Sequence, residues 1–351
     1  MEKIAEEQFK KEMVFHLYGR FAPIQNIVEK NRKGNEKLKI LDVGGRGNWM
    51  KKFFPEDDVF YLDPFLDSED ENFIKGDGCN MPLVDESFDW VVSTDVFEHI
   101  PKEKRKNFLE ENLRVAKLGV VLVAPFYSPA VAQAEINANE NYKMLHNGED
   151  HIWLKEHIEN GLPEMIEFEN LLEEKAVSFQ KLQNNRLFLW QLLLGMEFLI
   201  EENMSDELHS NHQKFNYFYN TEVFPFDNQD PSYRKIYFIK KSNELKDLEI
   251  AKSLIDDNLF LKTIKNAMDM MNKINIENKI SIEIKTKEVL NEKQKTQANE
   301  REIEAGEEKV QHLKDEIIQK EKQLSSVVNS LRWKIPNFLY KKYKQIKNYF
   351  G

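Results

Sequence analysis

Short apolar runs alternate with amphipathic stretches along residues 36–241. The runs KLKILDV, VFYLDPF, FIKGD, FDWVVST and GVVLVAPF are rich in β-branched and aromatic residues, which favours strands. The segment EHIPKEKRKNFLEENLRVAK lies before the last of these runs and carries apolar residues at helical spacing. Two later runs, AVSFQKLQ and YRKIYFIKK, bring the predicted strands to seven. Apolar strands separated by helices predict an α/β protein whose parallel sheet is covered on both faces.

The remaining segments of the first 241 residues predict helices and one long irregular stretch. Residues 1–35 predict two short helices that end at a turn near Gly34. About 25 largely polar residues follow Phe126, and a loop of this length inside a domain is usually functional. We therefore expect residues 127–175 to shape the pocket for a substrate. A helical pattern returns from Leu187 to about Tyr219.

The chain changes character beyond Lys241. Residues 242–300 predict a helical linker, and residues 301–331 predict a short coiled coil with apolar residues at heptad spacing, namely Val310, Leu313, Ile317, Leu324, Val327 and Leu331. Residues 332–351 contain six basic and no acidic residues, with aromatic residues at helical spacing. We expect the coil to form a homo-oligomer or bind a partner enzyme. The basic tail would lie on an anionic membrane surface or dock on a partner.

Composition narrows the possible partners and the compartment. The formal net charge of -11 argues against general binding of nucleic acid. A single cysteine, Cys79, excludes an intramolecular disulfide and fits a reducing compartment. The first residues are charged, and no uninterrupted apolar run is long enough for a spanning helix. We therefore expect a cytoplasmic protein, with peripheral contact at the inner face of the membrane through the tail.

A glycine-rich turn follows the first predicted strand. In KILDVGGRGNWM the strand ends near Asp42, and Gly44, Gly45 and Gly47 follow within five positions. Glycine lets the backbone turn tightly and approach a small ligand. The turn alone is a weak signal, because many α/β proteins turn in this way.

Acidic residues at the next strand ends make the signal stronger. Asp63 lies 19 residues after Gly44, near the spacing of acids that bind ribose hydroxyls, and Asp77 with Gly78 follows the third strand. Three carboxylates suit S-adenosylmethionine, because its ammonium, ribose diol and adenine amino group all offer donors. Asp42 would hold the ammonium, Asp63 the diol and Asp77 the adenine. The alternative is that these acids only cap helices.

Several motifs resemble those of a known enzyme family. DVGGRGN, YLDP, GDGCNMPLVDESFDWVVSTDVFEHIP and GVVLVAPF resemble the successive motifs of class I S-adenosylmethionine-dependent methyltransferases, in their small-molecule "type 11" branch. The resemblance implies a Rossmann-like sheet of order 3-2-1-4-5-7-6 with an antiparallel seventh strand. It also implies that Thr94 and Asp95 approach the methionyl end. One departure is that Arg46 and Asn48 occupy the later glycine positions of the loop.

Three histidines are candidates for a general base, which a hydroxyl acceptor requires. His99 follows the fourth strand, at the start of the expected helix, whereas His151 and His157 flank IWLKE in the expected pocket segment. The alternative is a packing role for His99 and surface positions for the other two. No metal site is expected, because HExxH and CxxC are absent. Glu156 and His157, being adjacent on a helix, point about 100° apart.

Two further likenesses concern the acceptor. EDHIWLKEHIENGLP resembles a segment of methyltransferases from bacterial surface-polysaccharide gene clusters, and NSLRWKIPNFLYK resembles the closing segment of polysaccharide-assembly enzymes. They imply methylation of a sugar or glycolipid hydroxyl and a glycosyltransferase partner for the coil.

Two other functions remain open from the sequence. A nicotinamide-dependent sugar oxidoreductase or epimerase would share the sheet, but Met50 stands where its third glycine is needed. Its Tyr-x-x-x-Lys pair would be Tyr237 and Lys241, which lie on a predicted strand, since the other pairs of this spacing are in the tail, outside the domain. A non-catalytic scaffold in a polysaccharide-assembly complex is the other alternative.

Overall fold

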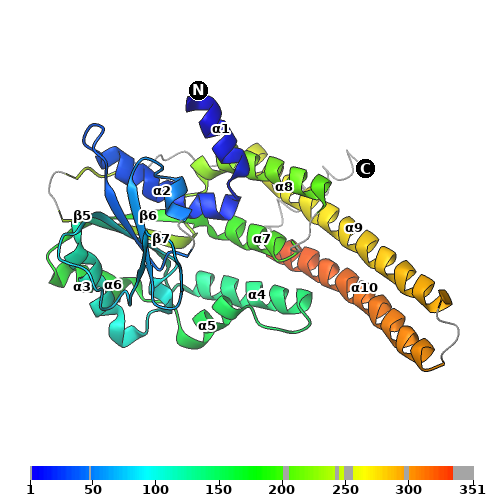
Figure 1. The fold of residues 1–351 in the computed structure, drawn as a ribbon. Coiled ribbons are helices and arrows are strands. Elements are labelled where there is room, and N and C mark those ends of the chain that lie inside the picture. The colour runs from blue at the N-terminus through cyan, green and yellow to red at the C-terminus, as the bar shows by residue number, and fades with distance from the viewer. Residues whose placement is uncertain are drawn as a thin grey trace. The chain divides into compact units, whose positions relative to one another are not determined.

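The computed structural model describes residues 2–46, 49–200, 205–241, 245–248, 256–295 and 300–334. The chain divides into two compact units. The first comprises Met1–Ile136, Ile152–Trp190 and Asn216–Ile255, and the second comprises Asn137–His151, Gln191–Phe215 and Asp256–Gly351. The sheet lies in the first unit, and the two longest helices lie in the second (Figure 1).

One mixed sheet of seven strands organises the first unit. The strands are β1 (Lys39–Val43), β2 (Asp58–Asp63), β3 (Phe73–Lys75), β4 (Phe88–Thr94), β5 (Ala116–Pro125), β6 (Ser178–Arg186) and β7 (Ser232–Lys240). Their order is β3-β2-β1-β4-β5-β7-β6, and β7 runs antiparallel to both of its neighbours. The predicted strands, their order and the antiparallel seventh strand are therefore confirmed.

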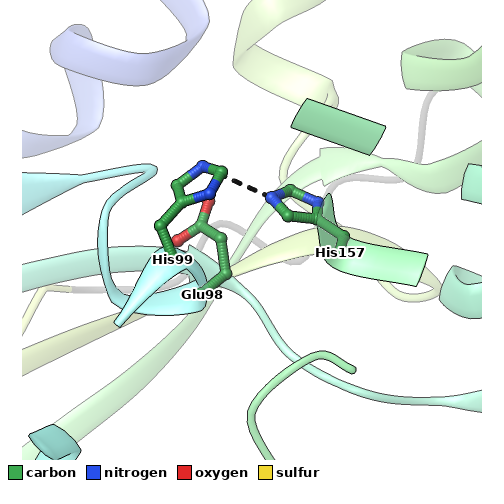
Figure 2. Close-up of side chains that lie close together, drawn as sticks. All are labelled: Glu98, His99 and His157. Carbon is green, nitrogen blue, oxygen red and sulfur yellow. Dashed lines mark hydrogen bonds between the residues drawn. The ribbon is translucent and has the colours of Figure 1, made fainter. Parts of the chain in front are cut away.

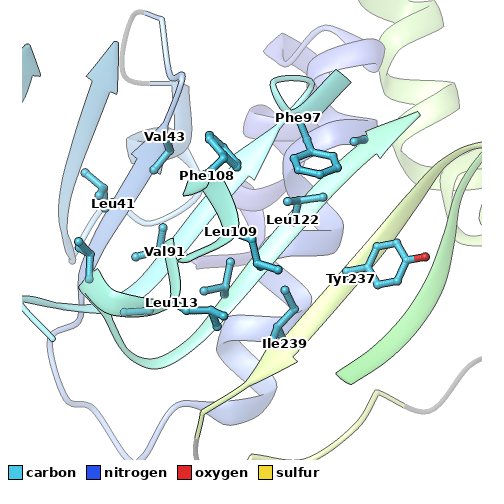
Figure 3. Close-up of a cluster of buried hydrophobic side chains, with 14 of the residues drawn as sticks. Leu41, Val43, Val91, Phe97, Phe108, Leu109, Leu113, Leu122, Tyr237 and Ile239 are labelled. Carbon is cyan, nitrogen blue, oxygen red and sulfur yellow. The ribbon is translucent and has the colours of Figure 1, made fainter. Parts of the chain in front are cut away.

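The central strands are buried on both faces because helices cover them. On one face, Val91 and Leu122 of the sheet pack with Phe108 and Leu109 from helix α3 (Arg105–Val115), as Figure 3 shows. Alternation along a strand turns Trp90, fully buried on β4, toward the opposite face. Helix α2 (Phe15–Asn31) contacts β4 and β6 as well.

Helices were predicted within residues 1–35 and from Leu187 to about Tyr219, where α1, α7 and α8 lie, whereas α5 and α6 lie in the expected pocket segment. These helices are α1 (Glu2–Glu12), α5 (Ile152–Asn160), α6 (Met165–Glu174), α7 (Leu187–Glu197) and α8 (Asp206–Phe218). Short turns complete the chain: η1 (Trp49–Lys52), η2 (Phe97–His99), η3 (Lys102–Lys104), η4 (Tyr219–Val223) and η5 (Phe224–Phe226). His99 was expected at the start of the helix after the fourth strand. It lies instead in the 3-10 turn η2, before α3 begins.

The prediction of an irregular stretch after Phe126 was wrong. Helix α4 spans Pro129–Leu145. Its buried side chains include Val131, Ala134 and Ala138, which recur at helical spacing. Alanine is the strongest helix former but contributes little hydrophobicity, so the polar residues between these positions concealed the helix.

Helices α9 (Asp257–Lys295) and α10 (Glu300–Lys334) pair within the second unit. They run antiparallel and side by side (Figure 1), and Lys279 Nζ lies 2.7 Å from Glu321 Oε1. Of the predicted coil residues, Val310, Ile317 and Leu324 are half-buried on α10, as is Leu313. The side chains of Val327 and Leu331, and the tail beyond Lys334, lie outside the described residues. No helix among the described residues combines the length and the apolar character needed to cross a membrane.

Candidate functional site

The three predicted cofactor acids lie at the same edge of the sheet. Asp42 is paired with Tyr61 near the end of β1, and Asp63 is paired with Lys75 at the end of β2. Asp77 lies two residues beyond the end of β3, whose last residue, Lys75, is paired with Asp63. Because β1, β2 and β3 are parallel neighbours, their carboxyl ends meet at one edge.

Asp42 is a buried carboxyl group without a cationic partner among the described residues. Asp42 is 2% exposed, and this burial raises the pKa of its carboxyl group to about 7. A carboxylate in this position is costly unless a cation approaches it. The arrangement fits a ligand that carries an ammonium group.

The glycine turn is held against Asp42 and against the residue that follows β4. Gly44 has a φ of +81°, and its N–H donates to the Leu62 carbonyl at 2.6 Å. A β-carbon on Gly44 would lie 2.3 Å from Val96 Cγ2, and one on Gly45 would lie 2.6 Å from Asp42 Oδ2. Both positions therefore require glycine. Gly47, the third predicted loop glycine, lies outside the described residues.

We expect Gly44→Ala to lower the free energy of unfolding by about 2–5 kcal/mol, from positive-φ strain and from overpacking against Val96. Gly34→Ala is the matched control, because Gly34 has a φ of +59° but open space around it. That variant should lose only about 1–2 kcal/mol, since it carries the strain alone. Urea unfolding measures both values. Equal losses would show that the Val96 contact costs nothing.

The Asp63 carboxylate already has polar partners within the protein. Its Oδ1 accepts the backbone N–H groups of Phe65 and Leu66, each at 2.7 Å, and its Oδ2 lies 3.4 Å from Arg46 Nε. Oδ1 thus shapes the turn after β2, and Oδ2 faces a loop cation. Arg46 departs from the glycine pattern of the loop, and nothing in the sequence pattern predicted its contact with Asp63.

Asp77 and Gly78 lie at the end of the third strand. Asp77 is exposed, and its Oδ1 accepts the N–H of Cys79 at 2.9 Å. A β-carbon on Gly78 would lie 2.8 Å from the ring of Phe108 and 3.0 Å from Val43. Gly78 therefore packs into the core behind the edge, while Asp77 lies exposed at the edge itself.

Thr94 and Asp95 differ in how their side chains are used. Thr94 Oγ1 is buried and has no hydrogen-bond partner among the described residues. Asp95 is bound by Arg234, whose Nη2 lies 2.8 Å from Oδ2, and by Arg20, whose Nε lies 2.9 Å from Oδ2. Burial alone would raise the pKa of Asp95, but the two arginines outweigh it and hold that pKa well below its ordinary value. The Asp95 carboxylate is therefore anchored within the fold.

Two of the three predicted histidines meet beside this edge (Figure 2). His99 on η2 and His157 on α5 face one another, with 3.4 Å between their Nε2 atoms. His157 Nδ1 lies 2.9 Å from Glu135 Oε1, and the Tyr233 hydroxyl donates to the same oxygen at 2.8 Å. A carboxylate can only accept, so Nδ1 of His157 carries the hydrogen. Its Nε2 is thereby aimed at His99.

Glu98 completes this group, which we call the His–Glu cluster: Glu98, His99 and His157. One oxygen or nitrogen from each lies within 4.8 Å of the others. Glu98 is 3% exposed, and its Oε2 is buried without a hydrogen-bond partner among the described residues. Burial, and after it the charge of Asp95, raises the pKa of Glu98 well above its ordinary value. Glu98 was not a candidate in the sequence analysis.

His99 has a polar neighbour on its other side. Its Nδ1 lies 3.3 Å from Glu156 Oε2, an ion-pair distance that lacks hydrogen-bond geometry. Burial and the neighbouring His157 lower the pKa of His99, while Glu156 raises it. The net pKa is below the ordinary value, which keeps the His99 ring neutral near pH 7.

Aromatic and cationic contacts connect the cluster to the glycine turn. The ring of Trp153 lies edge-on to His99 with centroids 5.1 Å apart, and the Arg46 guanidinium lies 5.4 Å from the Trp153 ring centroid. Val96, two residues before Glu98, touches the backbone at Gly44. The cofactor edge and the cluster are therefore adjacent parts of one unit.

His151 does not belong to this cluster. It lies in the second unit, where its ring packs edge-on against Tyr142 and at a tilt against Phe198. Its backbone N–H donates to Asn139 Oδ1 at 2.9 Å.

The pair required by an oxidoreductase is not assembled. Tyr237 lies on β7, and Lys241 directly follows that strand. The Tyr237 hydroxyl donates to Glu169 Oε1 at 2.8 Å, and Lys241 Nζ donates to the Ala116 carbonyl at 2.6 Å. Tyr237 is 0% exposed and lies within the hydrophobic core. Both polar groups therefore have structural partners.

Comparison with known proteins agrees with the topology. Residues 62–124 match the family model described as a methyltransferase domain. This match spans β2 to β5 and includes Asp63, Asp77 and the Glu98–His99 segment. The sheet order and the antiparallel β7 are those implied by the sequence resemblance. The fold is that of class I methyltransferases.

The solved structures that are similar to this chain are distant from it in sequence. An S-adenosylmethionine-dependent methyltransferase from Archaeoglobus fulgidus is 17% identical, with a TM-score of 0.38, and the match covers 68% of this chain and 99% of that one. One from Thermotoga maritima is 13% identical, with a TM-score of 0.38, covering 65% and 93%. An N-methyltransferase from Haemonchus contortus in complex with S-adenosylhomocysteine is 15% identical, with a TM-score of 0.38, covering 63% and 52%.

No curated protein gives a significant match. The fold and the family match support S-adenosylmethionine as the cofactor of the methyltransferase domain.

Proposed function

We propose that this protein transfers a methyl group from S-adenosylmethionine to a hydroxyl group of a sugar or glycolipid acceptor in surface-polysaccharide biosynthesis. The observation that carries the methyl-transfer part is the buried Asp42 carboxyl, which has no cationic partner in the described part of the chain and lies against the glycine turn. The family match over residues 62–124 supports the same reaction class.

Each residue at this edge of the sheet would bind a different part of the cofactor. Asp42 would bind the ammonium, and Gly44 and Gly45 would let the backbone pass beside the methionyl chain. Asp63 would accept from the ribose diol through Oδ2, after displacing the long Arg46 contact of 3.4 Å. S-Adenosylmethionine supplies an electrophilic methyl group on a sulfonium.

Asp77 and Gly78 would bound the adenine, with Asp77 accepting from its amino group. Thr94 offers a buried hydroxyl without a partner among the described residues. We infer that Thr94 contacts the methionyl end, while Asp95 acts on the site indirectly because its oxygens are held by two arginines.

The preference for a hydroxyl acceptor comes from the histidine pair. Transfer from a sulfonium is mainly a matter of positioning, but a hydroxyl oxygen must also lose its proton. His157 is fixed by Glu135, which in turn accepts from Tyr233. This fixed ring and its neighbour His99 could receive or relay that proton. An amine acceptor would have less need for such a group.

The accessory parts carry the rest of the proposal. We infer that the α10 segment binds a second copy or a glycosyltransferase, and that the basic tail places a cytoplasmic protein at the inner face of the membrane. The charge of -11 disfavours nucleic acid as the acceptor.

The function is tested with isotopically labelled methyl donor and cell-envelope extract. We expect label in a glycan or glycolipid fraction, in a linkage that resists base. His157→Ala should lower the rate about 100-fold or more, as loss of a positioned proton acceptor does, with cofactor affinity unchanged. His151→Ala is the control and should keep the parent rate. Absence of calorimetric binding to S-adenosylmethionine, or label confined to protein, would overturn the proposal.

A further inference from the structure

We propose that the His–Glu cluster is a binding site for one divalent transition-metal ion, with Zn²⁺ as the best match. Glu98, His99 and His157 would supply three ligands and leave one position open for an oxygen ligand. This inference goes beyond the reaction class, and the binding of the ion is independent of it.

The ligand set fits the chemistry of zinc. Two histidines and one carboxylate are a known protein set for Zn²⁺ sites that keep an open position. Nitrogens about 2.0–2.1 Å from a tetrahedral Zn²⁺ lie about 3.3–3.4 Å from each other. The Nε2 atoms of His99 and His157 are 3.4 Å apart. The two rings are therefore already at the spacing that one shared ion requires.

The surroundings orient the rings as a metal site requires. Metal-binding histidines usually donate their second ring N–H to a carboxylate, which fixes the tautomer and directs the other nitrogen at the ion. Glu135 accepts from His157 Nδ1, whereas Glu156 lies 3.3 Å from His99 Nδ1 without hydrogen-bond geometry. The His157 tautomer is thereby fixed with Nε2 left for the ion, and Figure 2 shows this nitrogen turned toward the ring of His99.

Glu98 supplies an independent observation. Its Oε2 is buried and lacks a hydrogen-bond partner among the described residues, and a carboxyl oxygen of Glu98 lies within 4.8 Å of a ring nitrogen of each histidine (Figure 2). A buried carboxyl oxygen without a partner is costly, and an ion at the cluster would satisfy it. No surface residue is needed to complete the site, because Glu98 and His157 are buried and His99 is half-buried.

The open position indicates what the ion would do. A hard oxygen from water or from a hydroxyl acceptor would complete the coordination. With both Nε2 atoms bound to the ion, the ion would lower the pKa of that hydroxyl, and it would replace His99 and His157 in the role of proton acceptor. The identification of that oxygen with the acceptor hydroxyl rests on the proposed function. A metal site could not be predicted from residue spacing, because its ligands come from two elements separated by more than 50 residues, without a short spacing motif.

The test uses untagged, full-length protein stripped with a chelator and then titrated with Zn²⁺ alone. We expect one tightly bound Zn²⁺ per chain, and a Co²⁺ form with the visible absorption of a tetrahedral site. Glu98→Gln and His157→Ala should weaken Zn²⁺ binding by about 100-fold or more, and Glu135→Gln by about 10–100-fold. His151→Ala, which removes a histidine of the other unit, should bind as the parent does.

Circular dichroism and S-adenosylmethionine calorimetry on each variant separate unfolding from loss of the ion. A folded parent that binds no stoichiometric Zn²⁺, or ligand variants that bind it as the parent does, overturns the metal site. A protein that binds Zn²⁺ but not S-adenosylmethionine leaves the metal site standing and removes the methyl-transfer proposal. The reverse result removes only the metal site.

Discussion

Replacing Asp42 with asparagine is expected to weaken the binding of S-adenosylmethionine by about 100-fold or more while stabilising the ligand-free protein. The loss of affinity follows because a buried, charge-paired carboxylate contributes about 2–5 kcal/mol when its partner is a ligand cation. The gain in stability follows because the ligand-free protein buries this carboxyl, and no cation pairs with it in the ranges that the structure describes. Calorimetry measures the affinity, and urea unfolding measures the stability.

The pH dependence of stability separates this explanation from a general effect. Burial raises the pKa of Asp42 from 3.8 to about 7, so the folded protein keeps a proton that the unfolded chain releases. Stability from this group is complete below pH 4 and is lost as the pH rises toward 7, by up to about 4 kcal/mol. Asp42→Asn should lack this loss and should therefore exceed the parent at pH 8 but not at pH 4.

Asp58→Asn is the matched control. Asp58 lies at the other end of β2, is exposed and pairs with Lys37 at 2.6 Å. Its substitution should change neither the affinity nor the pH profile by a measurable amount, because exposed ion pairs contribute little. If Asp42→Asn binds the cofactor as the parent does, the assignment of Asp42 to the ammonium is wrong.

Arg234→Met should lower the free energy of unfolding by about 3–5 kcal/mol, because it removes one partner from a buried ion pair. Arg234 is 6% exposed, donates to both oxygens of Asp95 and also reaches Asn185 Oδ1 at 2.9 Å. Its removal leaves the Asp95 carboxylate with Arg20 alone.

Arg20→Met provides the comparison for this ion pair. The Arg20 side chain is 34% exposed, so water can replace it more easily, and we expect a loss of about 1–2 kcal/mol. Chemical unfolding of both variants gives the difference. Equal losses for the two arginines would contradict the view that burial of Arg234 anchors the turn after β4.

The sheet could be predicted from the sequence because its signal is local. Runs such as KILDV and FDWVVST are rich in apolar β-branched and aromatic residues, and each is bounded by acids, glycines or helices. Strand order could not be derived from these runs, since it depends on contacts between distant segments, and it came from the family resemblance. Helix α4 was missed because its buried face is built from alanines.

The cofactor acids could be located because each closes a strand, and the strands are parallel neighbours. The His–Glu cluster could be predicted only in part. His99 and His157 were candidates, but nothing in the spacing set His157 apart from His151, six residues earlier. Glu135 lay in the segment expected to be irregular. Arg234, which anchors Asp95, looked like an ordinary strand residue.

The antiparallel pairing of α9 with α10 determines where along this helical hairpin a domain joined to it would lie. A 39-residue helix extends about 58 Å, so a chain leaving at its far end would be displaced by that length. Because α10 returns alongside α9, Lys334 lies back toward the start of the hairpin. A reporter domain fused after residue 334 would report on the base of the hairpin, and one inserted between the two helices would report on its tip.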